Sequence, residues 1–199
     1  ICWINSDDTF CADVFKEVAN CFTNNNKTDI VFGDMNVVDM KGNFMHRKRH
    51  LNFNYTMGCL LGFTTILSSN AVFWKKDAMI KNGYFNESLK CNMDGDFYSR
   101  LTKGMIVKRI NKALANFRKQ PYTKAAENDP NWNSTVKNET KYERERAYNS
   151  LLIASVIPYR YSVIIKLPFQ FARGLLRFFH LHYVLQKKEL RRFANGTKL

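Results

Sequence analysis

Two aspartates stand side by side in the segment WINSDDTF (residues 3–10), directly after a short apolar run. Because like charges at contact distance repel, Asp7 and Asp8 need a compensating partner, which a metal ion, a helix N-terminus or water could supply. Mg²⁺ and Mn²⁺ prefer oxygen ligands and typically take one or two carboxylates, the rest coming from phosphate and water. The pair is therefore a candidate site for a metal-bound nucleotide diphosphate. The alternative is that Asn5, Ser6 and the two aspartates only form a turn and cap the helix that follows.

A second acidic motif, NMDGDFYSRL (residues 92–101), places Asp94 and Asp96 near the start of a predicted helix. Residues i and i+2 of a helix point apart, so only one of the two carboxylates can face a cleft. A carboxylate in the first helical turn stays ionised, which suits a base that takes a proton from a hydroxyl group. The alternative is a helix cap, with Asp96 and Arg100 forming a surface pair at i and i+4.

Strand patterns surround these motifs. Residues 1–4 predict the end of a buried strand, and residues 29–34 predict a short apolar strand that continues into a hairpin with Gly42 in its turn. The segments MIVKRI (105–110) and ALANFR (113–118) predict two further strands. The apolar residues between the hairpin and the next helix fit neither a strand nor a helix clearly.

Helical patterns alternate with these strands. Residues 14–22 carry apolar side chains at helical spacing, and residues 75–82 predict a short helix that Gly83 ends. A third helix is predicted from about residue 94 to residue 103, again ended by a glycine, Gly104. The alternation of strands and helices predicts an α/β protein.

The chain changes character after residue 120. Residues 121–138 are polar and predict a loop, and residues 141–157 predict a helix that runs from charged to apolar residues. From residue 156 to the end there are nine lysines and arginines against Glu189 alone, so this tail carries much of the formal net charge of +14.

A strong basic excess indicates an anionic partner, such as nucleic acid, a lipid surface or a phosphorylated substrate. In the tail, aromatic and aliphatic residues interleave with the cations, which suits a helix lying in an anionic membrane surface. No apolar run there reaches the roughly 20 residues of a membrane span. The alternative is a helical cap packed on the domain. No recognisable nucleic-acid-binding module is present, so we expect no nucleic-acid partner.

Four motifs in register resemble glycosyltransferase family 2: WINSDDTF, DIVFGDMNVVDMKGN, AVFWKKDAMIKNGYFNESLKCNMDGDFYSRL and LANFR. The resemblance implies an A-type glycosyltransferase fold, an α/β fold with a Rossmann-like mixed sheet. It implies that residues 1–125 are the C-terminal part of the catalytic domain and that residues 126–199 are a linker and a basic amphipathic helical tail. The N-terminal half of the nucleotide site is then expected to precede Ile1.

The resemblance also implies a reaction and its site residues. A sugar would pass with inversion from a nucleotide-sugar donor to the hydroxyl of a saccharide or lipid-linked acceptor, in cell-surface polysaccharide or glycolipid synthesis. The implied roles are Asp8 for a divalent Mn²⁺ or Mg²⁺, Asp7 and Arg118 for the nucleotide sugar, Asp94 as general base, and Trp74 and Asp96 for the acceptor pocket. Trp74 and Asp96 have equally simple alternatives, as a core residue and a surface charge. Where many family members carry a histidine, this chain has Gln120.

The expected location follows from the cysteines and the tail. The five cysteines form no C-x-x-C pair, which favours a reducing compartment. We therefore expect a cytoplasmic protein that the tail holds at the cytoplasmic face of a membrane. The alternatives in function are a basic nucleic-acid-binding protein, which the charge and the aromatic residues would suit, and a catalytically inactive, membrane-associated scaffold of the same fold.

Overall fold

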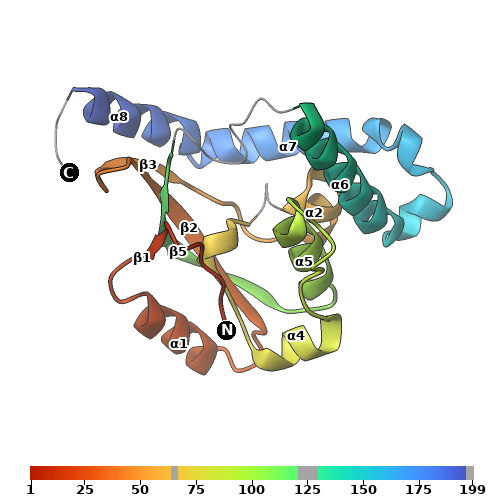
Figure 1. Ribbon diagram of the computed structural model, residues 1–199, viewed down its shortest axis with the longest axis horizontal. Helices are drawn as coiled ribbons and strands as arrows, with labels where there is room; N and C mark the ends of the chain where they lie inside the picture. Colours follow the sequence, from red (N-terminus) through yellow and green to blue (C-terminus); the bar gives the residue numbers. More distant parts are fainter. Residues whose placement is uncertain (64–66, 121–129, 196–199) are drawn as a thin grey trace.

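The computed structural model describes residues 1–63, 67–120 and 130–195. They form a mixed α/β structure in which helices cover both faces of a central sheet (Figure 1). The α/β class predicted from the alternation of strands and helices is confirmed.

The strand β2 (Ile30–Val38) is the centre of the sheet. It pairs in parallel with β5 (Val107–Arg118) along one edge. On its other edge it pairs antiparallel with β4 (Val72–Trp74) in its first half and with β3 (Phe44–Lys48) in its second half. The short strand β1 (Thr9–Phe10) adds to the far side of β5. The predicted hairpin is thus β2–β3, and Gly42 lies in its turn with φ +84°.

The strand end predicted at residues 1–4 is reduced to one bridge. Cys2 pairs antiparallel with Phe73. The amino group of Ile1 donates to the carbonyl of Trp74 at 2.7 Å, and the Trp74 N–H donates back at 2.9 Å. The segment that leads into the acidic pair is therefore attached to the outer edge of β4.

The two strands predicted at residues 105–110 and 113–118 form one strand, β5. Its pairing with β2 is irregular around Asp34, where β5 bulges. Gly33 precedes this point, and a Cβ atom there would lie 2.4 Å from Cγ of Leu114 on β5. The close approach of the two strands therefore requires glycine at position 33.

Three helices form where the apolar spacing predicts them. They are α1 (Val14–Asn24), α4 (Lys76–Asn82) and α5 (Met93–Leu101). Gly83 ends α4 with φ +88°, a left-handed conformation that glycine adopts without steric cost. The unassigned apolar segment contains a further helix, α2 (Tyr55–Leu61), which Asn54 caps by accepting the Met57 N–H at 2.9 Å.

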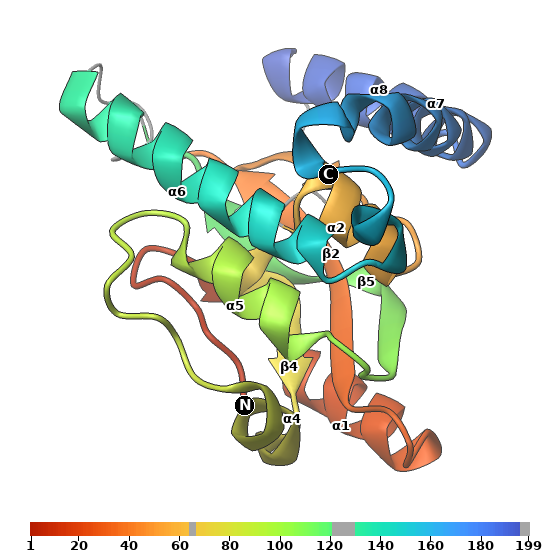
Figure 2. The ribbon, with the colours of Figure 1, turned by 90° about the vertical axis from the view of Figure 1, so that its right-hand side faces the viewer.

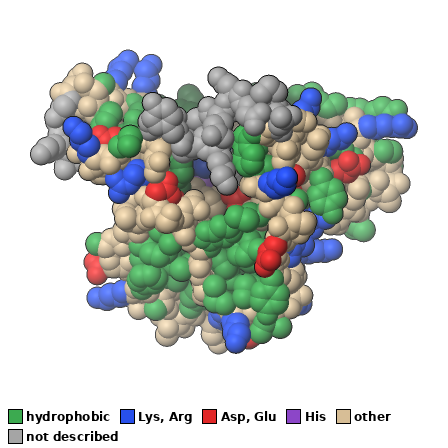
Figure 3. All heavy atoms as spheres, viewed as in Figure 1, with side chains coloured by type: hydrophobic (Ala, Val, Ile, Leu, Met, Phe, Trp, Pro, Cys, Tyr) green, Lys and Arg blue, Asp and Glu red, His purple; other side chains and the backbone are tan. Residues whose placement is uncertain are grey.

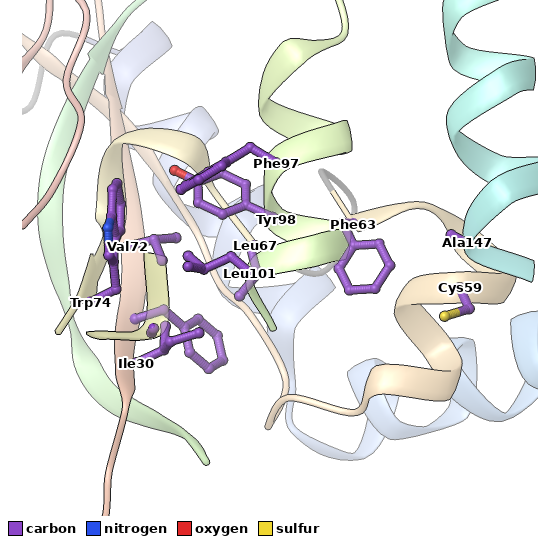
Figure 4. Packing of buried hydrophobic residues seen from close by; sticks show 12 residues of the cluster. Ile30, Cys59, Phe63, Leu67, Val72, Trp74, Phe97, Tyr98, Leu101 and Ala147 are labelled. Carbon is purple, nitrogen blue, oxygen red and sulfur yellow. The ribbon is translucent and has the colours of Figure 1, made fainter. Parts of the chain in front are cut away.

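Successive residues of β2 enter two cores because side chains alternate along a strand. Ile30 and Phe32 pack with α5, in a cluster that includes Trp74 and Tyr98 (Figure 4). Val31 points to the opposite face and packs with Val14, Val18 and Leu114 beneath α1. The apolar run of β2 is the expected pattern for a strand that is buried on both faces.

The loop predicted for residues 121–138 is wrong for its second part, while residues 121–129 lie outside the described residues. The helix α6 begins at Pro130 and runs to Asn149. Proline is well tolerated in a first helical turn, where its missing N–H has no helical partner. Further along, Glu139, Glu143 and Ala147 recur every four residues, and Ala147 is part of the main core. Figure 2 shows α6 lying across α5 and α2. Packing against these helices therefore stabilises α6 as a helix despite its polar composition.

The tail is helical, as predicted, and it packs on the domain through one side. After a 3-10 turn at Leu152–Ser155 come α7 (Val163–Phe179) and α8 (His182–Ala194). The helix α8 lies against β3, and α7 lies against α2. None of the helices in the described parts of the chain combines the length and apolar character needed to cross a bilayer.

One buried carboxylate ties three strands together. Asp34 on β2 is fully buried and accepts hydrogen bonds from Arg47 on β3 at 2.9 Å and from Arg109 on β5 at 2.8 Å. The His50 N–H adds a third bond at 3.0 Å. Two guanidinium groups and an N–H thus compensate the buried charge.

We expect Asp34→Asn to lower the free energy of unfolding by about 3–5 kcal/mol, because it leaves two partly buried guanidinium groups without their counter-charge. Chemical denaturation measures this loss. Asp77→Asn is the matched control, since Asp77 is exposed in the first turn of α4. Equal stabilities of the two variants would contradict this role for Asp34.

Candidate active site

A small cavity lies where the N-terminal segment meets the start of α5 and the 3-10 turn η1 (Ser69–Ala71). Its volume is about 180 Å³. The lining residues are Trp3, Ile4, Asn5, Ser69, Asn70, Cys91, Met93 and Asp94. Aromatic and apolar walls with a few converging polar groups are typical of a small-molecule site.

Asp94 is the charged residue of this cavity. It lies in the first turn of α5, where its Oδ1 accepts the Gly95 N–H at 2.8 Å and Ser69 supplies a side-chain hydrogen bond. Burial raises the pKa of Asp94, and these hydrogen bonds and the charge of Lys48 only partly oppose it. The helix start was expected to keep the carboxylate ionised, but desolvation has the larger effect and makes Asp94 a stronger base.

Asp8 lies behind the cavity wall in a shell of donors. Its Oδ1 accepts the Arg118 N–H at 2.9 Å, and its Oδ2 accepts from the side-chain amides of Asn70 at 3.2 Å and Asn5 at 3.4 Å. Burial raises the pKa of Asp8, and the neighbouring charge of Asp7 adds to this, while the hydrogen bonds lower it. Neutral N–H donors therefore hold the Asp8 carboxylate at a buried position where ionisation costs free energy.

Asp7 faces a different set of partners. Its Oδ2 accepts from Nε2 of Gln120 at 2.9 Å. The guanidinium of Arg118 does not contact the carboxylate: it donates to the main-chain carbonyls of Asp7 at 3.1 Å and Met40 at 2.7 Å. Arg118, which was expected to bind the nucleotide-sugar donor, thus fixes the loop that carries the acidic pair.

Asn5 and Asn70 connect the two acidic motifs. Both line the cavity with Asp94, and both donate to Asp8. Asn70 is buried, and its Oδ1 has no hydrogen-bond partner among the residues that the structure describes. The structure therefore places Asp94 and Asp8 next to the same pair of asparagines, and Oδ1 of Asn70 remains as an acceptor.

Trp74 and Asp96, expected at an acceptor pocket, do not line this cavity. Trp74 is buried in the main core with its ring centroid 5.3 Å from that of Phe97. Asp96 is also buried and forms ion pairs with Arg100 at 2.7 Å and Arg146 at 2.9 Å. It therefore attaches α6 to α5, and the predicted pair with Arg100 exists but is not a surface pair.

Lys48 lies near Asp94, and two cations of α7, Arg173 and Arg177, lie near Lys48. Lys48 is the last residue of β3. Burial and the charges of Arg177 and Arg173 on α7 lower the pKa of Lys48, whereas the charge of Asp94 raises it to a smaller extent. Burial and Arg177 lower the pKa of Arg173 in the same way. Within the described ranges, none of the three forms an ion pair with a carboxylate. Crowded cations without a counter-charge favour an anionic ligand.

Glu139 on α6 holds the loop that leads into α5. Its carboxylate accepts the N–H groups of Lys90, Cys91 and Asn92 at 2.9, 3.0 and 3.1 Å, and the Cys91 thiol as well. Burial alone would raise the pKa of Glu139, but these hydrogen bonds outweigh it and lower the pKa to about 2. Sequence reasoning missed this positioning residue because it falls between the loop predicted for residues 121–138 and the helix predicted from residue 141.

The site offers oxygen ligands for a divalent cation. Asp7, Asp8 and the unpartnered Oδ1 of Asn70 are the hard donors that Mg²⁺ and Mn²⁺ prefer. In the described parts of the chain, no group of three His, Cys, Asp or Glu side chains could hold a metal by itself. The residues fit a cation that is shared with a phosphate ligand, which needs only one or two carboxylates.

No model of a known protein family matches this chain, and no curated protein matches it significantly. The residues of the site are therefore the basis for assigning a function.

We expect Glu139→Gln to destabilise the protein by about 1–2 kcal/mol at neutral pH, because an amide cannot accept all the bonds that the carboxylate accepts. The folded pKa of about 2 lies below the usual value of 4.5, so this stabilisation is complete above pH 4.5 and is lost as the pH falls toward 2. The difference between wild type and variant in urea denaturation should shrink over that range. Glu145→Gln, also on α6, is the control, and a difference that does not depend on pH would contradict the assignment.

Pyrophosphate tests the cation cluster of Lys48, Arg173 and Arg177. It should raise the melting temperature of the wild type, and Arg173→Gln or Arg177→Gln should weaken its binding roughly tenfold, since each removes a charge-assisted contact. Arg160→Gln is the control, because Arg160 is exposed just before α7 and its guanidinium lies over the ring of Tyr161. Equal shifts in all variants would show that the cluster does not bind phosphate.

Proposed function

We propose that this chain belongs to an inverting glycosyltransferase with an A-type fold, which moves a sugar from a nucleotide-sugar donor to an acceptor hydroxyl. One observation carries the proposal: Asp94 shares a cavity with Asn5 and Asn70, whose amides bind Asp8. A base and a carboxylate suited to a metal–diphosphate complex thus lie next to the same two residues. The acceptor class is a saccharide or a lipid-linked saccharide.

Asp94 acts as the general base. Its carboxylate takes the proton from the acceptor hydroxyl while that oxygen bonds to the anomeric carbon and the bond to the diphosphate oxygen breaks. One displacement with one base inverts the anomeric carbon. The raised pKa of Asp94 suits this role, because a stronger base removes the proton more readily.

Asp8 would bind the divalent cation that accompanies the diphosphate of the donor. Asp8, with Asp7 and Oδ1 of Asn70 nearby, would hold Mg²⁺ or Mn²⁺, and a bound cation neutralises the charge that develops on the leaving diphosphate. Asp7 can alternatively bind a hydroxyl of the ribose or the donor sugar. The cation cluster of Lys48, Arg173 and Arg177 supplies further positive charge for phosphate oxygens.

The sheet supports the A-type assignment. The segment that leads to the acidic pair attaches to β4, β4 is antiparallel to β2, and β2 is parallel to β5. This mixed arrangement agrees with the Rossmann-like mixed sheet that the resemblance implies. In the cavity, Trp3 adds an aromatic wall beside the polar groups, which suits a sugar ring.

Asp94→Asn should reduce sugar transfer by about 10²–10⁴-fold, the range of general-base catalysis, and should leave donor binding nearly unchanged. Release of nucleoside diphosphate from UDP-, GDP- and dTDP-sugars with Mn²⁺ measures transfer in the full-length protein. The wild-type rate should fall as the pH drops through the pKa of Asp94, which lies above that of an ordinary aspartate.

Two controls separate catalysis from folding. Asp77→Asn should keep full activity, since Asp77 is exposed on α4. Asp8→Asn should weaken donor binding in the presence of Mn²⁺ and leave Asp94 in place. A wild-type protein whose melting temperature no donor shifts would contradict the proposal, and one that binds a donor without transferring the sugar would be a scaffold.

A further inference from the structure

The outward face of α7 is apolar over the length of the helix. Phe171 and Phe179 are 70% and 73% exposed, and the neighbouring apolar side chains are exposed as well. A stripe at helical spacing of three and four residues consists of Ile164, Leu167, Phe171, Leu175 and Phe178. Val163 and Phe179 flank this stripe, and no charged side chain interrupts it. Isolated exposed apolar residues are common, but a continuous stripe marks an interaction surface.

The opposite side of α7 is already committed to the domain. Ile165 and Phe169 pack against Leu60, Leu61 and Tyr148. Of the half-buried cations of α7, Arg173 and Arg177 belong to the cluster around Lys48, and Lys166 lies over the ring of Tyr159. The helix is therefore oriented with its cations inward and its apolar stripe outward, the reverse of an ordinary surface helix.

Exposed cations precede and follow the helix that carries the apolar stripe. Arg160 precedes α7, and Lys187, Lys188, Arg191 and Arg192 are exposed on α8. Glu189, the acidic residue of this helix, is bound to Arg49 at 2.5 Å and to the Arg47 N–H at 2.9 Å. The free charge around the stripe is thus positive. Figure 1 shows α8 continuing from α7 along the top of the molecule, and Figure 3, in the same view, shows hydrophobic side chains together with Lys and Arg side chains along the upper right edge.

We propose that α7 lies in the surface of a bilayer that contains anionic lipids. Its apolar stripe enters the boundary between headgroups and acyl chains, and the cations of α8 and Arg160 contact the headgroups. The helix has 17 residues, with a proline at position 168, and does not qualify as a membrane span, so it lies along the surface. A second copy of the chain fits the same face less well, because it would bring two sets of cations together. The proposal is independent of sugar transfer.

Vesicle sedimentation tests this docking on the full chain. Wild-type protein should bind vesicles of phosphatidylcholine mixed with phosphatidylglycerol, and salt should weaken the binding. Replacing Phe171, Phe178 and Phe179 together by serine should reduce partitioning by roughly tenfold or more, as should replacing Lys187, Lys188, Arg191 and Arg192 together by glutamine. All seven side chains are exposed, so circular dichroism should show an unchanged fold.

The control removes exposed apolar residues elsewhere. Ile80→Ser with Ile106→Ser should leave vesicle binding unchanged, since these residues lie on α4 and just before β5 and are 55% and 52% exposed. Three results would overturn the proposal: no binding of the wild type to mixed vesicles, equal binding of the triple serine variant, or equal affinity for pure phosphatidylcholine. A wild-type dimer that the serine variant loses, without any vesicle binding, would assign the stripe to self-association instead.

Discussion

The charge of Asp34 has to be compensated inside the sheet, because its carboxylate has no access to water. Arg47 reaches it from β3 and Arg109 reaches it from β5, so the ion pairs fix both strands against β2. Lys48 follows Arg47 directly, and Arg118 is the last residue of β5. The positions of two site residues therefore depend on a carboxylate that takes no part in the site.

The acidic pair raises the question of how two neighbouring carboxylates tolerate each other. The structure separates their partners: amides of Asn5 and Asn70 and the Arg118 N–H serve Asp8, whereas Gln120 serves Asp7. Gln120 is a poor metal ligand, but it is an effective hydrogen-bond donor at this place. The turn interpretation and the metal interpretation are thus compatible, since these donors position the pair without neutralising it.

Sequence periodicity predicted α1, α4, α5 and the β2–β3 hairpin, because each has a local signal in apolar spacing or a glycine. The acidic motifs and the family resemblance singled out Asp8 and Asp94, which both lie next to Asn70. Neither could find Asn70 itself, because this residue sits in an apolar segment without clear periodicity. Glu139 and the first part of α6 were missed, since packing on α5 overrides a polar composition, whereas residues 141–149 lie in the segment predicted to be helical. The cluster of Lys48, Arg173 and Arg177 joins residues more than a hundred positions apart, which no local pattern can reveal.

The parallel pairing of β2 with β5 has a consequence for synthesis on the ribosome. The hairpin with β3 can close as soon as Lys48 has emerged, since its strands are adjacent in sequence. The long edge of β2 that receives β5 stays open until residue 118 has been made. During that interval an apolar strand with unpaired main-chain groups is accessible to other nascent chains. Early closure of the hairpin, with Arg47 next to Asp34, would place a charged side chain beside this strand while it waits for its last partner.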